Sequence, residues 1–177
     1  RRTLTLMTRR PRKSRRHWIR VMDRIRLTQS VFDAMAHHAA ADHPAEACGL
    51  LLGPDGLKDG VQLVDEAIAS PNNAAQAGND RFEIDPGLHL RTRRDLRGTG
   101  RTVVGLYHSH PNGSALASAV DEAGARLEPG LIWLILPMKT QAQTITAGFP
   151  AAYVAGKQKM KPLPLDIPDA DPTPDAD

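Results

Sequence analysis

Apolar and polar positions alternate along the chain in a pattern that predicts strands with helices between them. Residues 25–27 form a short apolar run, and the next segment, from Thr28 to about Ala40, has apolar residues at helical spacing. A buried strand is predicted at residues 46–53, ended by the turn sequence Gly-Pro-Asp-Gly that begins at Gly53. Residues 61–68 are predicted to return beside this strand as the second half of a hairpin.

The second half of the chain continues this alternation. Asp85-Pro86 is a helix start, because proline suits the first turn, and the helix is expected to end at Gly98. The other predicted elements are strands at 82–84, 102–110, 131–136 and 144–149 and a helix at 118–127. Runs of strands with helices between some of them predict an α/β sandwich in which helices flank a mixed central sheet.

Length and composition narrow the class of protein. A chain of 177 residues is long enough for one domain. No run approaches the 18 consecutive apolar residues of a membrane-spanning helix, so a membrane is not an expected partner. The single cysteine, Cys48, excludes an intramolecular disulfide and a zinc site built from several cysteines. We therefore expect a reducing, cytoplasmic setting and assign Cys48 to packing.

Charge is distributed unevenly, which separates two tails from a central domain. Nine of the 23 Lys and Arg residues lie in residues 1–21, which contain no acid, so the formal charge of +3 becomes −6 from Met22 onward. This basic leader is expected to be disordered or to precede a true start at Met22. Nucleic-acid binding and a targeting role are the alternatives, but it lacks the apolar core of a signal peptide and interleaved aromatic residues. Residues 22–156 are the predicted folded domain, and the Pro- and Asp-rich residues 157–177 are expected to be disordered.

The candidate chemistry is concentrated in the pattern H-x-H-P-x6-S-x2-D, which runs from His108 to Asp121. His108 and His110 lie two apart on a predicted strand, so both imidazoles project from one face and can share a metal. Asp121 follows on the first turn of the next predicted helix, three residues after Ser118. Two histidines and one carboxylate are the ligands of a catalytic zinc site, which keeps a position open for water.

Less specific interpretations exist for each of these residues. The histidines could be ordinary surface or core residues, and Ser118 with Asp121 could cap a helix, which is compatible with catalysis. With this composition, the whole pattern should arise by chance in roughly one of 10^4 such chains. Three further histidines, His37, His38 and His43, lack matching carboxylate spacing and are expected to be solvated or capping.

Glu46 is the candidate general base. It lies at the start of the predicted buried strand, in the sequence EACGLLLG, where an unpaired carboxylate costs several kcal/mol unless it has a partner or a task. Accepting a proton from water beside a metal would supply both.

Together, Glu46, the His-Ser-His-Pro sequence that begins at His108, Ser118 and Asp121 resemble the signature of the JAMM (MPN+) metalloprotease family. The sequences HPAEACGLLLG and VVGLYHSHP resemble its short bacterial members, and the similarity covers about residues 25–149. The resemblance implies a single-domain MPN-like fold of the cytidine-deaminase-like type, with one zinc ion per chain. It implies that His108, His110 and Asp121 bind zinc, that Glu46 is the general base, and that Ser118 hydrogen-bonds the oxyanion or the water.

The resemblance also implies a substrate class. Members of this family cleave after the C-terminal glycine of ubiquitin or a ubiquitin-like protein, whose tail docks as an extended strand at a sheet edge. Residues 72–81 and 137–143 are short compared with eukaryotic deubiquitinases, which argues against selectivity for a ubiquitin-chain linkage. Deconjugation, and trimming of a small sulfur-carrier protein with a Gly-Gly terminus, both stay open, as does the oligomeric state. The alternatives from other classes are a noncatalytic scaffold of the same fold and a nucleic-acid-binding module that depends on the leader.

Overall fold

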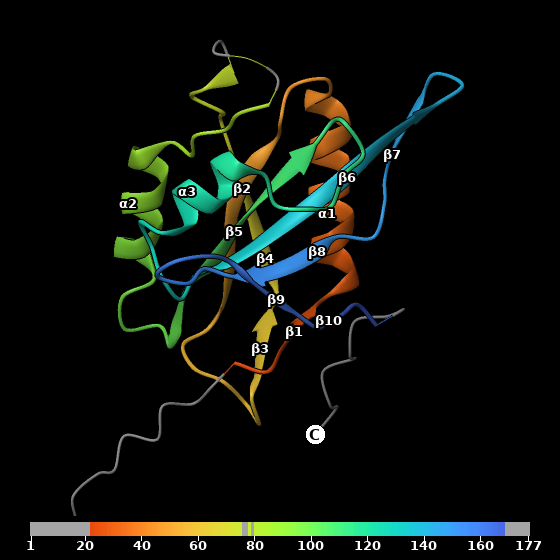
Figure 1. Ribbon diagram of the computed structural model, residues 1–177. Helices are drawn as coiled ribbons and strands as arrows, with labels where there is room; N and C mark the ends of the chain where they lie inside the picture. Colours follow the sequence, from red (N-terminus) through yellow and green to blue (C-terminus); the bar gives the residue numbers. More distant parts are fainter. Residues whose placement is uncertain (1–21, 76–77, 79, 169–177) are drawn as a thin grey trace, which may run out of the picture.

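The computed structural model describes residues 22–75, 78 and 80–168, which form thirteen helices and strands (Figure 1). The basic leader, residues 1–21, and the end of the tail, residues 169–177, lie outside the described residues. In chain order the elements are β1 (Arg24–Leu27), α1 (Gln29–Asp42), β2 (Cys48–Pro54), β3 (Val61–Val64), β4 (Glu66–Ser70), α2 (Pro86–Asp95), β5 (Arg101–His110), α3 (Ala119–Ala125), β6 (Ile132–Gln141), β7 (Thr144–Ala147), β8 (Ala151–Val154), β9 (Lys161–Leu163) and β10 (Leu165–Asp166).

Most of these strands form one large mixed sheet. Its strand order is β4-β2-β5-β6-β8-β9, and β7 pairs with the distal part of β6. The pair β5–β6 is parallel and the remaining pairs of this sheet are antiparallel. A second, three-stranded sheet, β10-β1-β3, is held by parallel pairs. The mixed central sheet flanked by helices, predicted from the sequence, is therefore present.

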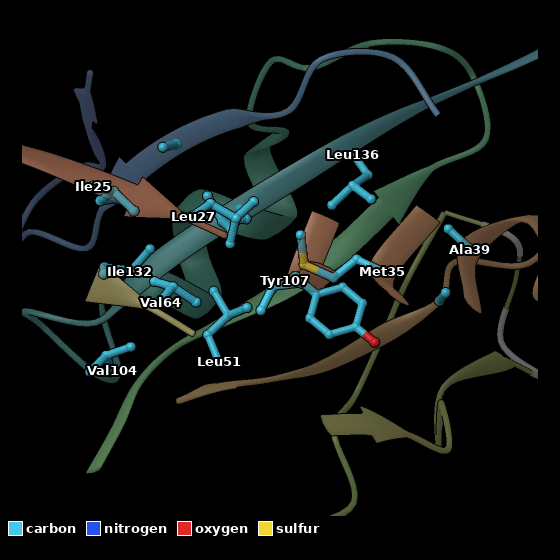
Figure 2. Close-up of a cluster of buried hydrophobic side chains, with 14 of the residues drawn as sticks. Ile25, Leu27, Met35, Ala39, Leu51, Val64, Val104, Tyr107, Ile132 and Leu136 are labelled. Carbon is cyan, nitrogen blue, oxygen red and sulfur yellow. The ribbon is translucent and has the colours of Figure 1, made fainter. Parts of the chain in front are cut away.

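One face of the large sheet is covered by α1. Thr28 caps this helix, because its side chain accepts a hydrogen bond from the backbone N–H of Val31. Val31, Met35 and Ala39 form the buried stripe of the helix, each at most 3% exposed. Figure 2 shows Met35 beside Tyr107 of β5 in the main hydrophobic cluster. Burying this stripe on the sheet fixes α1 where the 3.6-residue period predicts it.

The opposite face carries α2 and α3 (Figure 1). Leu50 and Leu52 of β2 pack there with Leu88 and Leu96 from the α2 region, whereas Leu51 between them faces the α1 cluster. A strand buried on both faces reads as a continuous apolar run rather than an alternating one, as CGLLLG does. The functional side chains described below lie on this α2–α3 face.

The hairpin predicted for residues 61–68 is wrong in part. The chain divides at Asp65, whose carboxylate accepts two hydrogen bonds from the Arg101 guanidinium at 2.7 and 3.0 Å. The part after the break, β4, pairs antiparallel with β2 as expected, whereas β3 pairs parallel with β1 in the second sheet. The strand expected at residues 82–84 is reduced to one isolated bridge between Asn72 and Ile84.

The prediction of disorder from residue 157 onward is also wrong for residues 157–168. β9 pairs with β8 and β10 pairs with β1, so this part of the tail supplies an edge strand to each sheet. The apolar residues of the segment all pack into the protein. Met160 is 5% exposed, and Leu163, Leu165 and Ile167 pack against the main cluster. Proline is compatible with these positions because both strands lie at sheet edges.

Within the part of the chain that the structure describes, no helix has the length and apolar character needed to cross a membrane.

Candidate metal and catalytic site

The central strand β5 holds His108 and His110 in place. β5 pairs with β2 on one side and β6 on the other, and His108 lies in register with Cys48 and Ile135. The two imidazoles project from the same face, as the two-residue spacing predicts, and their Nε2 atoms are 3.0 Å apart. Because the strand is paired on both sides, its backbone can move little, and the two rings keep this relation.

Asp121 reaches the same point from α3. Its Oδ1 lies 3.1 Å from His108 Nε2, and its Oδ2 lies 3.3 Å from His110 Nε2. A capping box orients the carboxylate: the Ser118 backbone N–H donates to Asp121 Oδ2 at 2.7 Å, and the Asp121 N–H donates to Ser118 Oγ at 3.1 Å. The helix start and the ligand are thus one structural unit, so the capping and metal-binding interpretations of these residues hold together.

These three side chains are suited to a metal ion. His110 Nδ1 lies 3.0 Å from the Ser114 carbonyl oxygen, which can only accept, so Nδ1 carries the proton and neutral His110 presents a lone pair at Nε2. This lone pair faces the Asp121 carboxylate and His108 Nε2, so acceptor atoms converge on one point. The three side chains are no more than 6% exposed. Among the described residues, they form the one group of His, Cys, Asp and Glu side chains placed to hold a metal.

The pKa shifts of the two histidines are opposite in sign. Burial lowers the pKa of His108, which keeps this ring neutral and able to donate a lone pair to a metal. For His110, burial lowers the pKa, but the hydrogen bond and charge of Asp121, with the charge of Glu46, outweigh it and raise the pKa. The site therefore favours positive charge, which either a proton or a metal cation supplies.

Glu46 lies at the edge of this group. Its Oε1 is 3.9 Å from His110 Nε2, and the residue is 5% exposed. Burial raises the pKa of Glu46 to about 7, with the charges of Asp121 and Asp80 acting in the same direction and that of His110 against it. A carboxylate with a pKa near neutrality can both take and return a proton. A cavity of about 270 Å³ opens beside it, lined by Glu46, Asp80, Pro111 and Asn112.

Aromatic rings support the metal-ligand group from behind. The Phe82 ring stacks on His108 with the centroids 4.3 Å apart and the planes 19° apart, and Trp133 meets His108 edge-on at 5.8 Å. Both rings also line an apolar groove of about 440 Å³ on the α2–α3 face, and Asp121 lies in its wall. The exposed side chains of Val120 and Leu127 border the groove. Of the candidate site residues, Asp121 lines this groove, whereas Glu46 lines the separate cavity described above.

The structure brings together all five site residues that the sequence predicts. Three further side chains, those of Phe82, Asn72 and Ser109, contact these residues or the backbone beside them. Phe82 was expected only as part of a strand, and nothing in its spacing linked it to His108. Asn72 and Ser109 hold the backbone next to Glu46 by side-chain hydrogen bonds. Ser109 could have been noticed from its place between the two histidines, whereas Asn72 lies in a turn-like Pro-Asn-Asn sequence without a distinguishing signal.

One histidine outside the site departs from expectation. His38 was predicted to be solvated or capping, but its Nδ1 lies 2.8 Å from the hydroxyl of buried Tyr107, and its Nε2 lies 3.2 Å from Asp42. A buried tyrosine hydroxyl needs a hydrogen-bond partner, and His38 of α1 is that partner for Tyr107 of β5.

Comparisons with known proteins show which family this chain resembles. The family model described as prokaryotic homologs of the JAB domain matches residues 28–147. The desampylase of Haloferax volcanii is 32% identical over 116 residues, which are 63% of this chain and 79% of that protein. The CysO-cysteine peptidase of Mycobacterium tuberculosis is 33% identical over 89 residues, which are 50% of this chain and 57% of the peptidase.

A similar fold is known from solution structures. A protein from Desulfitobacterium hafniense matches with a TM-score of 0.64 and 27% identity, over 81% of this chain and 92% of that one. A protein from Salinibacter ruber matches with a TM-score of 0.57 and 26% identity over the same shares of the two chains. The predicted fold class is confirmed by these matches.

Proposed function

The chain belongs to the family of prokaryotic homologs of the JAB domain, and on that premise we propose that it is a zinc-dependent peptidase or isopeptidase that cleaves after the C-terminal glycine of a ubiquitin-like protein. The predicted resemblance to the JAMM family is confirmed, and so is the prediction of a JAMM-type peptidase, since relatives carry the names desampylase and CysO-cysteine peptidase. Zinc as the metal and the Gly-Gly tail as the substrate are our proposals.

One observation carries the proposal: three buried ligand atoms converge beside a buried carboxylate. Two imidazole nitrogens and a carboxylate are a typical set of three protein ligands for catalytic zinc, which would keep a further position for water or substrate. His108, His110 and Asp121 would hold the zinc ion. When bound there, zinc supplies Lewis-acid chemistry, because it makes water more acidic and polarises a carbonyl group.

The residues of this chain perform the proton transfers. Glu46 accepts the proton of the attacking water and returns it to the leaving amine, for which a pKa of about 7 is suitable. Ser118 has a hydroxyl hydrogen free to donate to the oxygen of the scissile carbonyl, because its oxygen accepts from the Asp121 N–H. The apolar walls around His108, formed by Phe82 and Trp133, exclude water from one side of the site.

The groove supports an extended protein tail as the substrate. It is lined largely by apolar side chains and has Asp121 in its wall, which fits a chain that carries apolar residues upstream and two small residues at the reacting end. The names of the relatives point to two such substrates, a ubiquitin-like modifier and a sulfur-carrier protein. We propose deconjugation or precursor processing first, and sulfur-carrier processing as the alternative. A reducing, cytoplasmic location accords with the free, buried Cys48.

The test combines metal content with cleavage. Purified protein should contain about one zinc per chain and should release the tail from a Gly-Gly-linked fusion or conjugate. Glu46→Gln should keep zinc but lose activity by roughly 10^2- to 10^4-fold, the usual contribution of general acid–base catalysis. Asp121→Ala should lose zinc and activity together, since it removes a ligand.

Three outcomes would contradict parts of the proposal. Protein that contains no zinc after reconstitution excludes the metal site. A Glu46→Gln variant that keeps zinc and cleaves as fast as the parent shows that Glu46 is not the base. Protein that holds zinc but cleaves none of several Gly-Gly-tailed substrates favours a noncatalytic scaffold of the same fold.

A further inference from the structure

We infer that Asn72 and Ser109 are positioning residues that together clamp the peptide group between Glu46 and Ala47 and so fix the general base relative to the metal-ligand strand. This role rests on the proposed function, because it assumes that Glu46 acts as the base. It assigns a task to two side chains that touch neither the proposed metal nor the reacting atoms.

A clamp is needed because Glu46 lies outside the strand ladder. β2 begins at Cys48, which pairs with Ser70 on one side and His108 on the other. The carbonyl of Glu46 and the N–H of Ala47 belong to one peptide group, which precedes this pairing. Both residues are buried, at 5% and 0% exposure, and an unpaired buried peptide group is costly.

Two side chains satisfy this peptide group from opposite directions. Asn72 Nδ2 donates to the Glu46 carbonyl oxygen at 2.9 Å, and the Ala47 N–H donates to Ser109 Oγ at 2.9 Å. The Ser109 N–H in turn donates to the Ala47 carbonyl oxygen at 2.9 Å. The peptide group that follows the base is therefore tied directly to the residue between the two metal-binding histidines.

Asn72 extends the clamp to the nearby described residues 74 and 81–83. Its Nδ2 also donates to the Arg81 carbonyl oxygen, and its Oδ1 accepts from the N–H groups of Ala74 and Glu83. The two donors and two acceptors of the amide thus all face backbone partners, which leaves a single orientation for it. The same segment carries Phe82, which stacks on His108, so one amide relates the base, the segment and a metal ligand.

The consequence is that small changes in the clamp should affect rate more than metal binding. His108, His110 and Asp121 are positioned by β5 and α3 and make none of these hydrogen bonds. Glu46 would shift instead, and a displacement of about 1 Å in a catalytic group can cost roughly 10^2-fold in rate.

The test uses two substitutions with matched controls on the zinc-loaded full chain. Asn72→Asp keeps the size and both acceptor bonds but places an oxygen in the position of the donor to the Glu46 and Arg81 carbonyls. Asn73→Asp makes the same change in charge at the exposed neighbour, whose side chain makes no hydrogen bond among the described residues. Ser109→Ala removes the acceptor for the Ala47 N–H, and Ser109→Thr restores a hydroxyl.

We expect zinc content near one per chain in all four variants. Asn72→Asp and Ser109→Ala should lower kcat by roughly 10- to 100-fold with KM changed less than about twofold, whereas Asn73→Asp and Ser109→Thr should stay close to the parent. Hydrogen exchange at the Ala47 amide should be faster in the first two variants, which a general loss of stability, shared by distant amides, would not reproduce.

The inference would be overturned if Asn72→Asp and Asn73→Asp had the same kcat at equal zinc content. Should Asn72→Asp fail to fold, the comparison of Ser109→Ala with Ser109→Thr decides, since equal kcat in these two also overturns it. Failure of the proposed function looks different: the parent itself is inactive, or Glu46→Gln is as active as the parent. In that case hydrogen exchange at the Ala47 amide alone tests the clamp. Equal exchange rates at this amide in the parent and in Asn72→Asp would overturn the inference.

Discussion

Ser118 combines a structural and a proposed catalytic role in one hydroxyl, and substitutions can separate them. Its oxygen accepts the Asp121 N–H at 3.1 Å and so caps α3, while the hydroxyl hydrogen has no partner among the described residues. Ser118→Ala removes the cap and the donor. Ser118→Gly removes the donor but is well tolerated at a helix N-cap, and Ser118→Thr keeps both functions.

The expected magnitudes differ between the two roles. Loss of the cap in Ser118→Ala should cost about 1 kcal/mol, whereas Ser118→Gly should cost only a few tenths. In a chain of this length, about 1 kcal/mol corresponds to a fall in Tm of roughly 2–4 °C. Loss of one donor to a developing oxyanion should lower kcat by roughly 10^2- to 10^3-fold in both variants. The Ser118 backbone N–H still orients Asp121 in each case, so zinc should stay bound.

The assay measures kcat on a Gly-Gly-tailed substrate, Tm and zinc content for the parent and the three variants. We expect Ser118→Ala and Ser118→Gly to be equally slow although they differ in Tm. If Ser118→Gly cleaves as fast as the parent and only Ser118→Ala is slow, activity follows the cap and the hydroxyl has no catalytic role. If both cleave as fast as the parent, neither role matters to the reaction.

Three further predictions concern the scaffold. A chain ending at residue 156 should unfold at a much lower urea concentration than one ending at residue 168, because it loses β9, β10 and buried Met160, a change of at least about 3 kcal/mol. Gly105→Ala should destabilise the sheet by about 1–3 kcal/mol or more in the same assay, because the new methyl group would overlap the backbone of Ile132 in β6. Cys48, which is fully buried and whose pKa burial raises to about 12, should react with iodoacetamide at least roughly 100-fold more slowly in native protein than in urea.

The parts of the fold that the sequence predicts are those set by local patterns. The helix after Thr28 follows from one cap and one apolar stripe, and the alternation of His108 and His110 follows from the geometry of a strand. The errors concern long-range pairing. No local pattern shows that β3 and β4 belong to different sheets, because this depends on their partners β1 and β2, and Asp65 between them contacts Arg101, which lies 36 residues away. The composition of residues 157–168 likewise predicts disorder, although their four apolar residues, Met160, Leu163, Leu165 and Ile167, are sufficient to anchor two edge strands.

In the candidate site, too, local patterns could be predicted from the sequence and long-range contacts could not. The close approach of His108, His110 and Asp121 beside Glu46 could be predicted, because the chemistry of a zinc site restricts residue types and spacing. Phe82 and Asn72 could not, because their contacts with His108 and Glu46 join residues that are 26 apart in the sequence. Asparagine in a turn and phenylalanine near a strand are common, so neither stands out before the chain is folded.

The arrangement of the site implies that metal binding and rate can vary independently. The ligands are held by a strand paired on both sides and by a closed capping box, so their geometry should tolerate changes in the surrounding segments. The peptide group beside the proposed base is held by two side-chain hydrogen bonds outside the ladder, and Phe82 and Ile84, which flank Glu83, line the groove. If the proposed substrate tail fills the groove, it contacts Phe82 and Ile84, and Glu83 is joined through Asn72 to the Glu46 carbonyl. Such a tail would act on Glu46 through Asn72 and on His108 through the stacked Phe82 ring, while β5 and the capping box limit the movement of the candidate ligands.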